Sequence, residues 1–272
     1  MSKKYKNSVQ IYEDRVIKKR NNDLLELYEY LDTVRYDNYP EIIDINDREV
    51  TTKYIKEEKY HEVSKGVELM KTLSMLHYKT MFFKDVSKNK YKTIYKKLLS
   101  NIEYLTKYYE EAIEEIENEE LMSPSHYLFA RNYSAIDGSL KYAKEELKKW
   151  FKIVEHKSKE RVCINHNNVS FEHFIHGDKN YLISWDNYLV DTPILDLYKF
   201  YKKEGYKLDF PYLLKVYNET LSLTDEEKML FNVLISIPPK IVRIDNEMDN
   251  TYNIKNTFSY IYSGIGVVSE NK

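Results

Sequence analysis

The sequence contains a single cysteine, Cys163, among its 272 residues. One cysteine excludes an intrachain disulfide, and it also excludes the paired CxxC motifs of structural zinc sites. Both exclusions are typical of proteins from a reducing compartment. We therefore expect a cytoplasmic protein that is not stabilised by crosslinks.

The chain also lacks an excess of charge of either sign and any long apolar run. Its 42 Lys and Arg residues are matched by 44 Asp and Glu residues, which leaves a formal net charge of -2. This balance gives no electrostatic basis for a nucleic-acid partner. No run of 18 apolar residues occurs, and none follows the basic N-terminus. We therefore expect no membrane segment and no cleaved signal peptide.

Glycine and proline are scarce, with 6 of each. Scarcity of these turn residues favours long helices over a many-turned β protein. The 27 tyrosines supply much of the apolar area that a core needs. We interpret them as packing residues, because a base-stacking platform would require an accompanying basic groove.

The first 58 residues predict a small β-rich lobe. The expected elements are, in order, two short strands within residues 8–20 around a turn at Glu13–Asp14, a helix over residues 23–33 capped by Asn22, and a second hairpin over residues 41–46 and 49–55. The rest of the chain, residues 59–272, predicts a mainly helical lobe. Its expected helices cover residues 60–80, 88–118, 124–159, 194–201, 210–218 and 225–236, with Ser123 as an N-cap.

A short segment, residues 161–197, interrupts the helical pattern. It begins with an apolar strand over residues 161–164 and continues through a hairpin whose arms are residues 174–175 and 181–185. Along it lie, in order, His166-Asn167-Asn168, His173, Ile183-Ser184-Trp185, Pro193 and Asp196-Leu197.

This order resembles the active-site segment of the aminoglycoside-phosphotransferase and choline-kinase-like family. In that family the pattern is His-Gly-Asp, an Asn five residues after the Asp, Ile-Asp-Trp, and then Asp-Pro and Asp-Leu. The helix end Leu73-Ser74-Met75-Leu76-His77 is also similar, and there His77 is expected to be a buried, hydrogen-bonded residue. The resemblance implies an α+β, two-lobed protein-kinase-like fold.

The resemblance places neutral residues at the positions that carry the chemistry. Asn168 stands at the position of the catalytic Asp, in the same tripeptide as His166. The magnesium positions are His173, for an amide, and Ser184, for a carboxylate. Phosphotransferases of this class need an acid to orient the acceptor hydroxyl and oxygen ligands to hold magnesium. The resemblance therefore implies a catalytically inactive pseudokinase, similar to kinase-like proteins of bacterial spore coats.

A second tripeptide, His176-Gly177-Asp178, spells the catalytic motif literally. Only six residues separate Asp178 from Trp185, which leaves no room for a catalytic loop followed by a hairpin. We interpret it as a tight turn.

The N-terminal lobe holds the residues that the resemblance assigns to the nucleotide. Lys18 is the candidate phosphate contact, and Glu26 or Glu29 is its candidate ion-pair partner. A solvated Lys-Lys-Arg run is the alternative interpretation of Lys18. No glycine precedes Gly66, so a glycine-rich phosphate loop is absent from the sequence.

Two functions follow from the resemblance. The first is a binding or scaffold protein, with a protein partner or a small molecule in the interlobe cleft. The alternative is an ATP- and magnesium-dependent kinase of a small hydroxyl or amine compound, in which Asp186 replaces Ser184 as the metal ligand, ahead of Glu172 or Asp178. ATP and magnesium are implied as cofactors only by this alternative. A cleft that binds nucleotide without turnover is a third interpretation.

Overall fold

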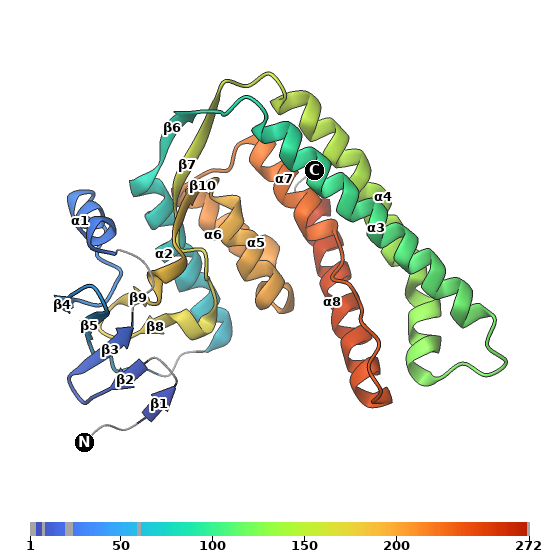
Figure 1. Ribbon diagram of the computed structural model, residues 1–272, viewed down its shortest axis with the longest axis horizontal. Coiled ribbons are helices and arrows are strands. Elements are labelled where there is room, and N and C mark those ends of the chain that lie inside the picture. The colour runs from blue at the N-terminus through green and yellow to red at the C-terminus, as the bar shows by residue number, and fades with distance from the viewer. Residues whose placement is uncertain (1–3, 7–8, 20–23, 59–60, 271–272) are drawn as a thin grey trace. The chain divides into compact units, whose positions relative to one another are not determined.

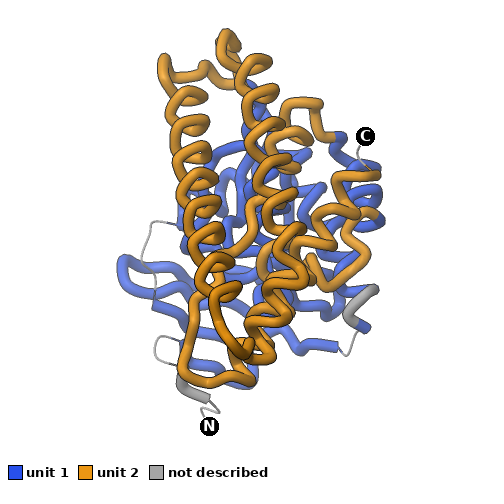
Figure 2. Tube along the Cα trace, turned by 90° about the vertical axis from the view of Figure 1, so that its right-hand side faces the viewer, with its two compact units in different colours: residues 1–83, 161–200, 212–222 blue, residues 84–160, 201–211, 223–272 orange. Residues whose placement is uncertain are grey.

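The computed structural model describes residues 4–6, 9–19, 24–58 and 61–270. The chain forms two compact units, which Figure 2 distinguishes by colour. Unit 1 comprises residues 1–83, 161–200 and 212–222, and unit 2 comprises residues 84–160, 201–211 and 223–272. Because each unit gathers segments that are far apart in the sequence, the lobe boundary at residue 58 stays a prediction.

Unit 1 contains a five-stranded antiparallel sheet with the order β1-β2-β3-β5-β4 (Figure 1). The elements are β1 (Lys4–Lys6), β2 (Val9–Ile11), β3 (Arg15–Lys19), α1 (Leu25–Thr33), β4 (Ile42–Ile45) and β5 (Glu49–Lys53). Both expected hairpins and the expected helix are confirmed, whereas β1 was not expected. The proposed cap Asn22 lies outside the described residues.

In the remainder of unit 1, segments from the middle of the chain contact helix α2 (Glu62–Thr80). The other elements that lie wholly or partly in unit 1 are β6 (Phe82–Asp85), β7 (Lys159–Asn165), β8 (Phe174–His176), β9 (Asn180–Leu182), β10 (Leu189–Asp191), α5 (Ile194–Lys203) and α6 (Phe210–Thr220). Strand β7 lies between β10 and β6. The Thr80 hydroxyl accepts a hydrogen bond from the Ile164 N–H at 3.0 Å, which ties the end of α2 to β7.

The hairpin of β8 and β9 contains the tripeptide His176-Gly177-Asp178 at its turn, as the sequence predicts. Gly177 is required there because a Cβ atom would lie 2.9 Å from the Ile55 side chain and 3.3 Å from the Lys56 carbonyl. Asp178 is exposed and accepts a hydrogen bond from the Tyr181 hydroxyl at 2.8 Å. The tripeptide is therefore a structural turn that packs closely against the chain at residues 55–56.

Unit 2 is helical. Its main elements are α3 (Lys90–Glu117), α4 (Pro124–Val154), α7 (Asp225–Ser236) and α8 (Glu247–Glu270), and Figure 1 shows α3 and α4 side by side as a long hairpin. The expected cap is present, since the Ser123 hydroxyl accepts a hydrogen bond from the His126 N–H at 3.3 Å. Within the described ranges, no helix is long and apolar enough to cross a membrane.

The structure confirms the expected fold class. A small antiparallel sheet with one helix forms the N-terminal part, and the larger part of the chain is mainly helical, with antiparallel hairpins rather than parallel crossover units.

Candidate functional site

A cavity of about 230 Å³ lies within unit 1, against one face of the N-terminal sheet. Its sheet-side walls are the pairs Val9 and Ile11, Val16 and Lys18, and Val50 and Thr52, and the opposite side includes Ile183, Ser184, Trp185 and Asp186. Each pair is separated by two positions, so both members point to the same face of the sheet. The spacing of two positions could have identified these wall residues from the sequence. Our expectations from the sequence relied on the kinase-like motif and did not use this spacing.

Lys18 and Asp186 form an ion pair at the polar end of this cavity. Asp186 is nearly buried, and about a quarter of the Lys18 side chain is exposed. The expected pairing of Lys18 with Glu26 or Glu29 is wrong, since both glutamates are exposed on α1 and the ammonium group binds Asp186 instead. The interpretation of Lys18 as part of a solvated run is wrong for the same reason.

Ser184 lies two residues after the end of β9 and directly precedes the turn that contains Asp186. Its backbone has φ 68° and ψ 58°, which is the left-handed region, and Trp185–Asn187 then forms a short 3-10 turn. The expectation that Ser184 and Asp186 share one strand face is therefore wrong, because β9 stops at Leu182. The 3-10 turn nevertheless brings both residues to the wall of the cavity.

Asp196 anchors the loop that carries the catalytic position. Its carboxylate is fully buried and accepts hydrogen bonds from the backbone N–H groups of His166, at 2.7 Å, and Asn167, at 2.6 Å. The His77 Nε2–H group lies 3.2 Å from the same carboxylate, and His77 Nδ1 lies 2.7 Å from the Tyr217 hydroxyl. The expected structural role of His77 is thus confirmed.

His166 fastens this loop to the residues around Ser184. Its Nε2–H group donates a hydrogen bond to the Ile183 carbonyl at 2.8 Å, and its ring packs edge-on against Trp185 with centroids 4.8 Å apart. Complete burial lowers the pKa of His166 to about 4, although the nearby Asp196 carboxylate opposes this shift. The imidazole is therefore neutral at neutral pH, and it positions the chain.

Asn168 and His173 interact with each other. The His173 Nδ1–H group donates to the Asn168 carbonyl at 2.9 Å, and the Asn168 side-chain amide lies 3.4 Å from His173 Nε2. The Ser170 hydroxyl is a further neighbour, 3.0 Å from His173 Nδ1. An amide cannot accept a proton at neutral pH, so Asn168 itself offers no general base at the position of the catalytic Asp.

The side chains at the expected magnesium positions do not fit a magnesium ion. Magnesium prefers oxygen ligands in octahedral geometry. Ser184 supplies a neutral hydroxyl, His173 supplies an imidazole, and the Asp186 carboxylate is paired with the Lys18 ammonium. In the part of the chain that the structure describes, no three His, Cys, Asp or Glu residues converge on a point that would hold a metal ion.

Comparison with known structures identifies the fold. The chain is similar to an aminoglycoside phosphotransferase from Alicyclobacillus acidocaldarius, with a TM-score of 0.68, 8% identity, and coverage of 98% of this chain and 90% of that one. It is also similar to a spectinomycin phosphotransferase solved as an AMP-bound complex, with a TM-score of 0.55, 13% identity, and coverage of 94% and 90%. No family model and no curated relative matches the sequence.

These similarities confirm the expected protein-kinase-like fold of aminoglycoside phosphotransferases. At identities of 8% and 13% they describe the arrangement of the backbone and not the chemistry. The chemistry has to be argued from the side chains of this chain.

Proposed function

We propose that the protein is a pseudokinase that binds a ligand or a protein partner without transferring a phosphoryl group. The observation that supports the proposal is the contact of Asn168 with His173, the residues that the resemblance places at the positions of the catalytic Asp and of a magnesium ligand. Loss of a positioned general base alone costs on the order of 10² to 10⁴ in rate. Here the metal ligands are lost as well.

The scaffold of the site is intact, which supports a retained binding role. His166, Trp185 and Asp196 still hold the loop in place through buried contacts. Unit 1 also keeps a mainly apolar cavity of about 230 Å³ that ends at Lys18 and Asp186. We propose that a small molecule occupies this cavity, and that the protein acts in the cytoplasm or in association with a spore.

One observation favours the alternative of an active small-molecule kinase. Asp186 lines the cavity beside Lys18 and is the carboxylate that faces it from the turn after Ser184. If Lys18 moved to a nucleotide phosphate, the Asp186 carboxylate would be released to bind a metal ion.

A thermal-shift experiment separates the two functions. We expect the melting temperature to be unchanged by ATP, with or without magnesium chloride. The same measurement on the Asp186→Ala variant is the control for the metal. A magnesium-dependent rise that the substitution abolishes would contradict the pseudokinase proposal and favour the kinase.

The triple variant Asn168→Asp, His173→Asn and Ser184→Asp tests whether the lost groups are what prevents binding of the metal and nucleotide. Asp tolerates the left-handed conformation of residue 184 well. We expect ATP with magnesium, at about 100 times the dissociation constant, to raise the melting temperature of the triple variant by roughly 5 °C.

The matched control replaces Ser184 by Ala in the same background, which leaves one magnesium carboxylate missing. We expect this control to show no magnesium-dependent rise. An identical response of both triple variants would mean that position 184 does not determine metal binding.

A further inference from the structure

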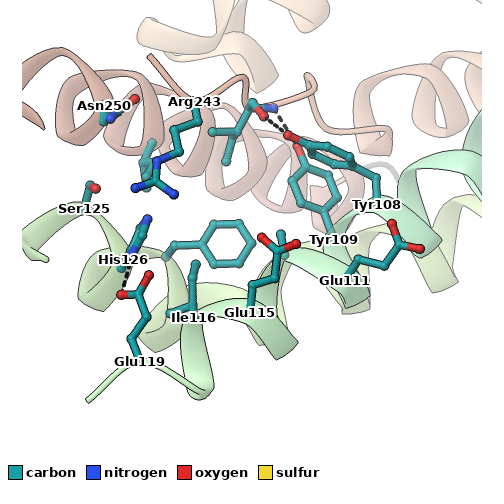
Figure 3. Close-up of a pocket in the computed structure, with 14 residues that line it drawn as sticks. Tyr108, Tyr109, Glu111, Glu115, Ile116, Glu119, Ser125, His126, Arg243 and Asn250 are labelled. Atoms are coloured by element: carbon teal, nitrogen blue, oxygen red, sulfur yellow. Dashed lines mark hydrogen bonds and ion pairs between the residues drawn. The ribbon is translucent and has the colours of Figure 1, made fainter. Parts of the chain in front are cut away.

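Unit 2 contains a separate cavity of about 190 Å³ between α3, the start of α4 and residues 241–254 (Figure 3). Its apolar floor and walls include Tyr109, Ala112, Ile116, Phe129 and Ile254. The rings of Tyr109 and Phe129 lie 6.0 Å apart. An apolar cavity of about 150 Å³ holds a benzene molecule, so this one has room for a single aromatic or branched aliphatic group.

The wall opposite α3 is a segment without regular secondary structure, Pro239–Ile244, that is tied down at both ends. The Tyr109 hydroxyl donates to the Pro239 carbonyl at 2.6 Å and accepts from the Ile241 N–H at 3.0 Å. At the other end, the Asn250 side chain accepts from the Ile244 N–H at 2.9 Å and donates to the Ile244 carbonyl at 2.6 Å. The cavity therefore has fixed walls before any ligand binds, which lowers the entropic cost of binding.

Ile241 and Arg243 of this segment line the cavity, while the intervening Val242 is 60% exposed and does not line it. Arg243 makes no ion pair or hydrogen bond within the described residues. Its guanidinium group extends from the Pro239–Ile244 segment toward α3 in Figure 3.

Three glutamates line the cavity at intervals of four residues, two of them on α3 and Glu119 just after its end, and their partners differ. Glu111 lies 3.6 Å from Lys107, and Glu119 lies 2.7 Å from His126. Glu115, between them, has no ion-pair partner among the residues described. In Figure 3 its carboxylate extends from α3 toward the cavity, from the wall opposite to Arg243.

The cavity thus carries an anion on one wall, a cation on the other, and aromatic rings between them. Arg243 and Glu115 are not within ion-pair distance of each other, so neither neutralises the other directly. We propose that this cavity binds a small zwitterion with an apolar body, namely a free amino acid with an apolar side chain. Its carboxylate binds the Arg243 guanidinium, its ammonium group binds Glu115, and its side chain packs on Tyr109 and Phe129.

This ligand class matches both walls better than a simple cation or a simple anion does. A cation leaves the Arg243 charge unpaired, and an anion brings a third negative charge next to Glu115 and Glu111. A carboxylate also suits the planar, bidentate geometry of a guanidinium group. The inference is independent of the proposed function, because every residue that it uses belongs to unit 2.

The experiment measures binding of L-phenylalanine to the full-length protein by ligand-observed NMR or calorimetry. Two matched compounds each lack one charge: phenethylamine lacks the carboxylate, and 3-phenylpropanoate lacks the ammonium group. We expect L-phenylalanine to bind about fivefold more tightly than either, since a contact with an exposed charged group is weak.

Two variants test the two contacts separately. Glu115→Gln and Arg243→Gln are each expected to weaken L-phenylalanine binding about fivefold. Both residues are exposed, so the variants should fold. The matched controls are Glu117→Gln on α3 and Arg131→Gln on α4, which change the same charges away from the cavity lining and should bind as the unsubstituted protein does.

Any of the following results would contradict the proposal. Binding of phenethylamine as tight as that of L-phenylalanine would indicate a cation site, and equal binding of 3-phenylpropanoate would indicate an anion site on Arg243. No binding of any of the three compounds would mean that the cavity is not a site for this class of ligand. Weakening by the control variants would show that the effect is general electrostatics.

Discussion

Replacing Asp196 by Ala is expected to lower the free energy of unfolding by about 3–5 kcal/mol, since removal of one partner from a buried charged network leaves the other groups uncompensated. The Asp196 carboxylate is fully buried and holds the N–H groups of His166 and Asn167. Without it the buried His166 N–H and the half-buried Asn167 N–H lose their acceptor, and so does His77 Nε2. Asn167 is also held at φ 63°, a strained conformation that these bonds maintain.

The measurement is urea denaturation followed by circular dichroism. The matched control is Asp37→Ala, which removes a carboxylate from an exposed ion pair with Lys179. That pair is expected to contribute at most about 1 kcal/mol. Equal losses for the two variants would show that the Asp196 network contributes no more than a surface ion pair.

Acid is expected to destabilise the protein through His166. Its pKa is about 4 in the folded protein because the ring is completely buried, whereas an unfolded chain has a histidine pKa of about 6.5. Between these values the unfolded state binds a proton that the folded state does not bind. Stability is therefore highest above pH 6.5, falls as the pH decreases from 6.5 to 4, and loses about 3 kcal/mol from this group.

The His166→Gln variant isolates this contribution. A glutamine keeps an N–H donor for the Ile183 carbonyl but does not titrate. We expect the unfolding free energy of the variant to change less between pH 7 and pH 4 than that of the unsubstituted protein. His156→Gln is the control, because the His156 side chain is 90% exposed. The idea fails if both variants keep the full pH dependence.

Much of the fold was predictable because its signals are local. The helices of unit 2 repeat apolar residues every three or four positions, and Ser123-Pro124 marks the start of α4. The turn at Gly177 was also predictable. Only six residues separate Asp178 from Trp185, which is too few for a catalytic loop followed by a hairpin. By contrast, β1, β6 and β10 were missed, because strands of three or four residues are too short to give a periodic signal.

The site was predictable in its motif positions but not in its contacts. Asp186 is 168 residues from Lys18 in the sequence, and no spacing rule connects them. The strand expected through Trp185 failed at Ser184, whose left-handed backbone depends on the surrounding packing. The cavity of unit 2 was not predicted either, because its opposite charges lie on α3 and on a segment between α7 and α8.

In the unit 1 cavity, the Asp186 carboxylate competes with anionic ligands for the Lys18 ammonium group. A carboxylate held in place by the fold acts at a high effective concentration toward the lysine. An anionic ligand must displace this carboxylate from Lys18. The apparent affinity of the ligand is therefore its intrinsic affinity multiplied by the fraction of molecules in which the ion pair is open. A neutral ligand that packs on Val16 and Val50 does not have to open the pair. The cavity is thereby biased toward uncharged compounds, which is the opposite of what a nucleotide triphosphate would require.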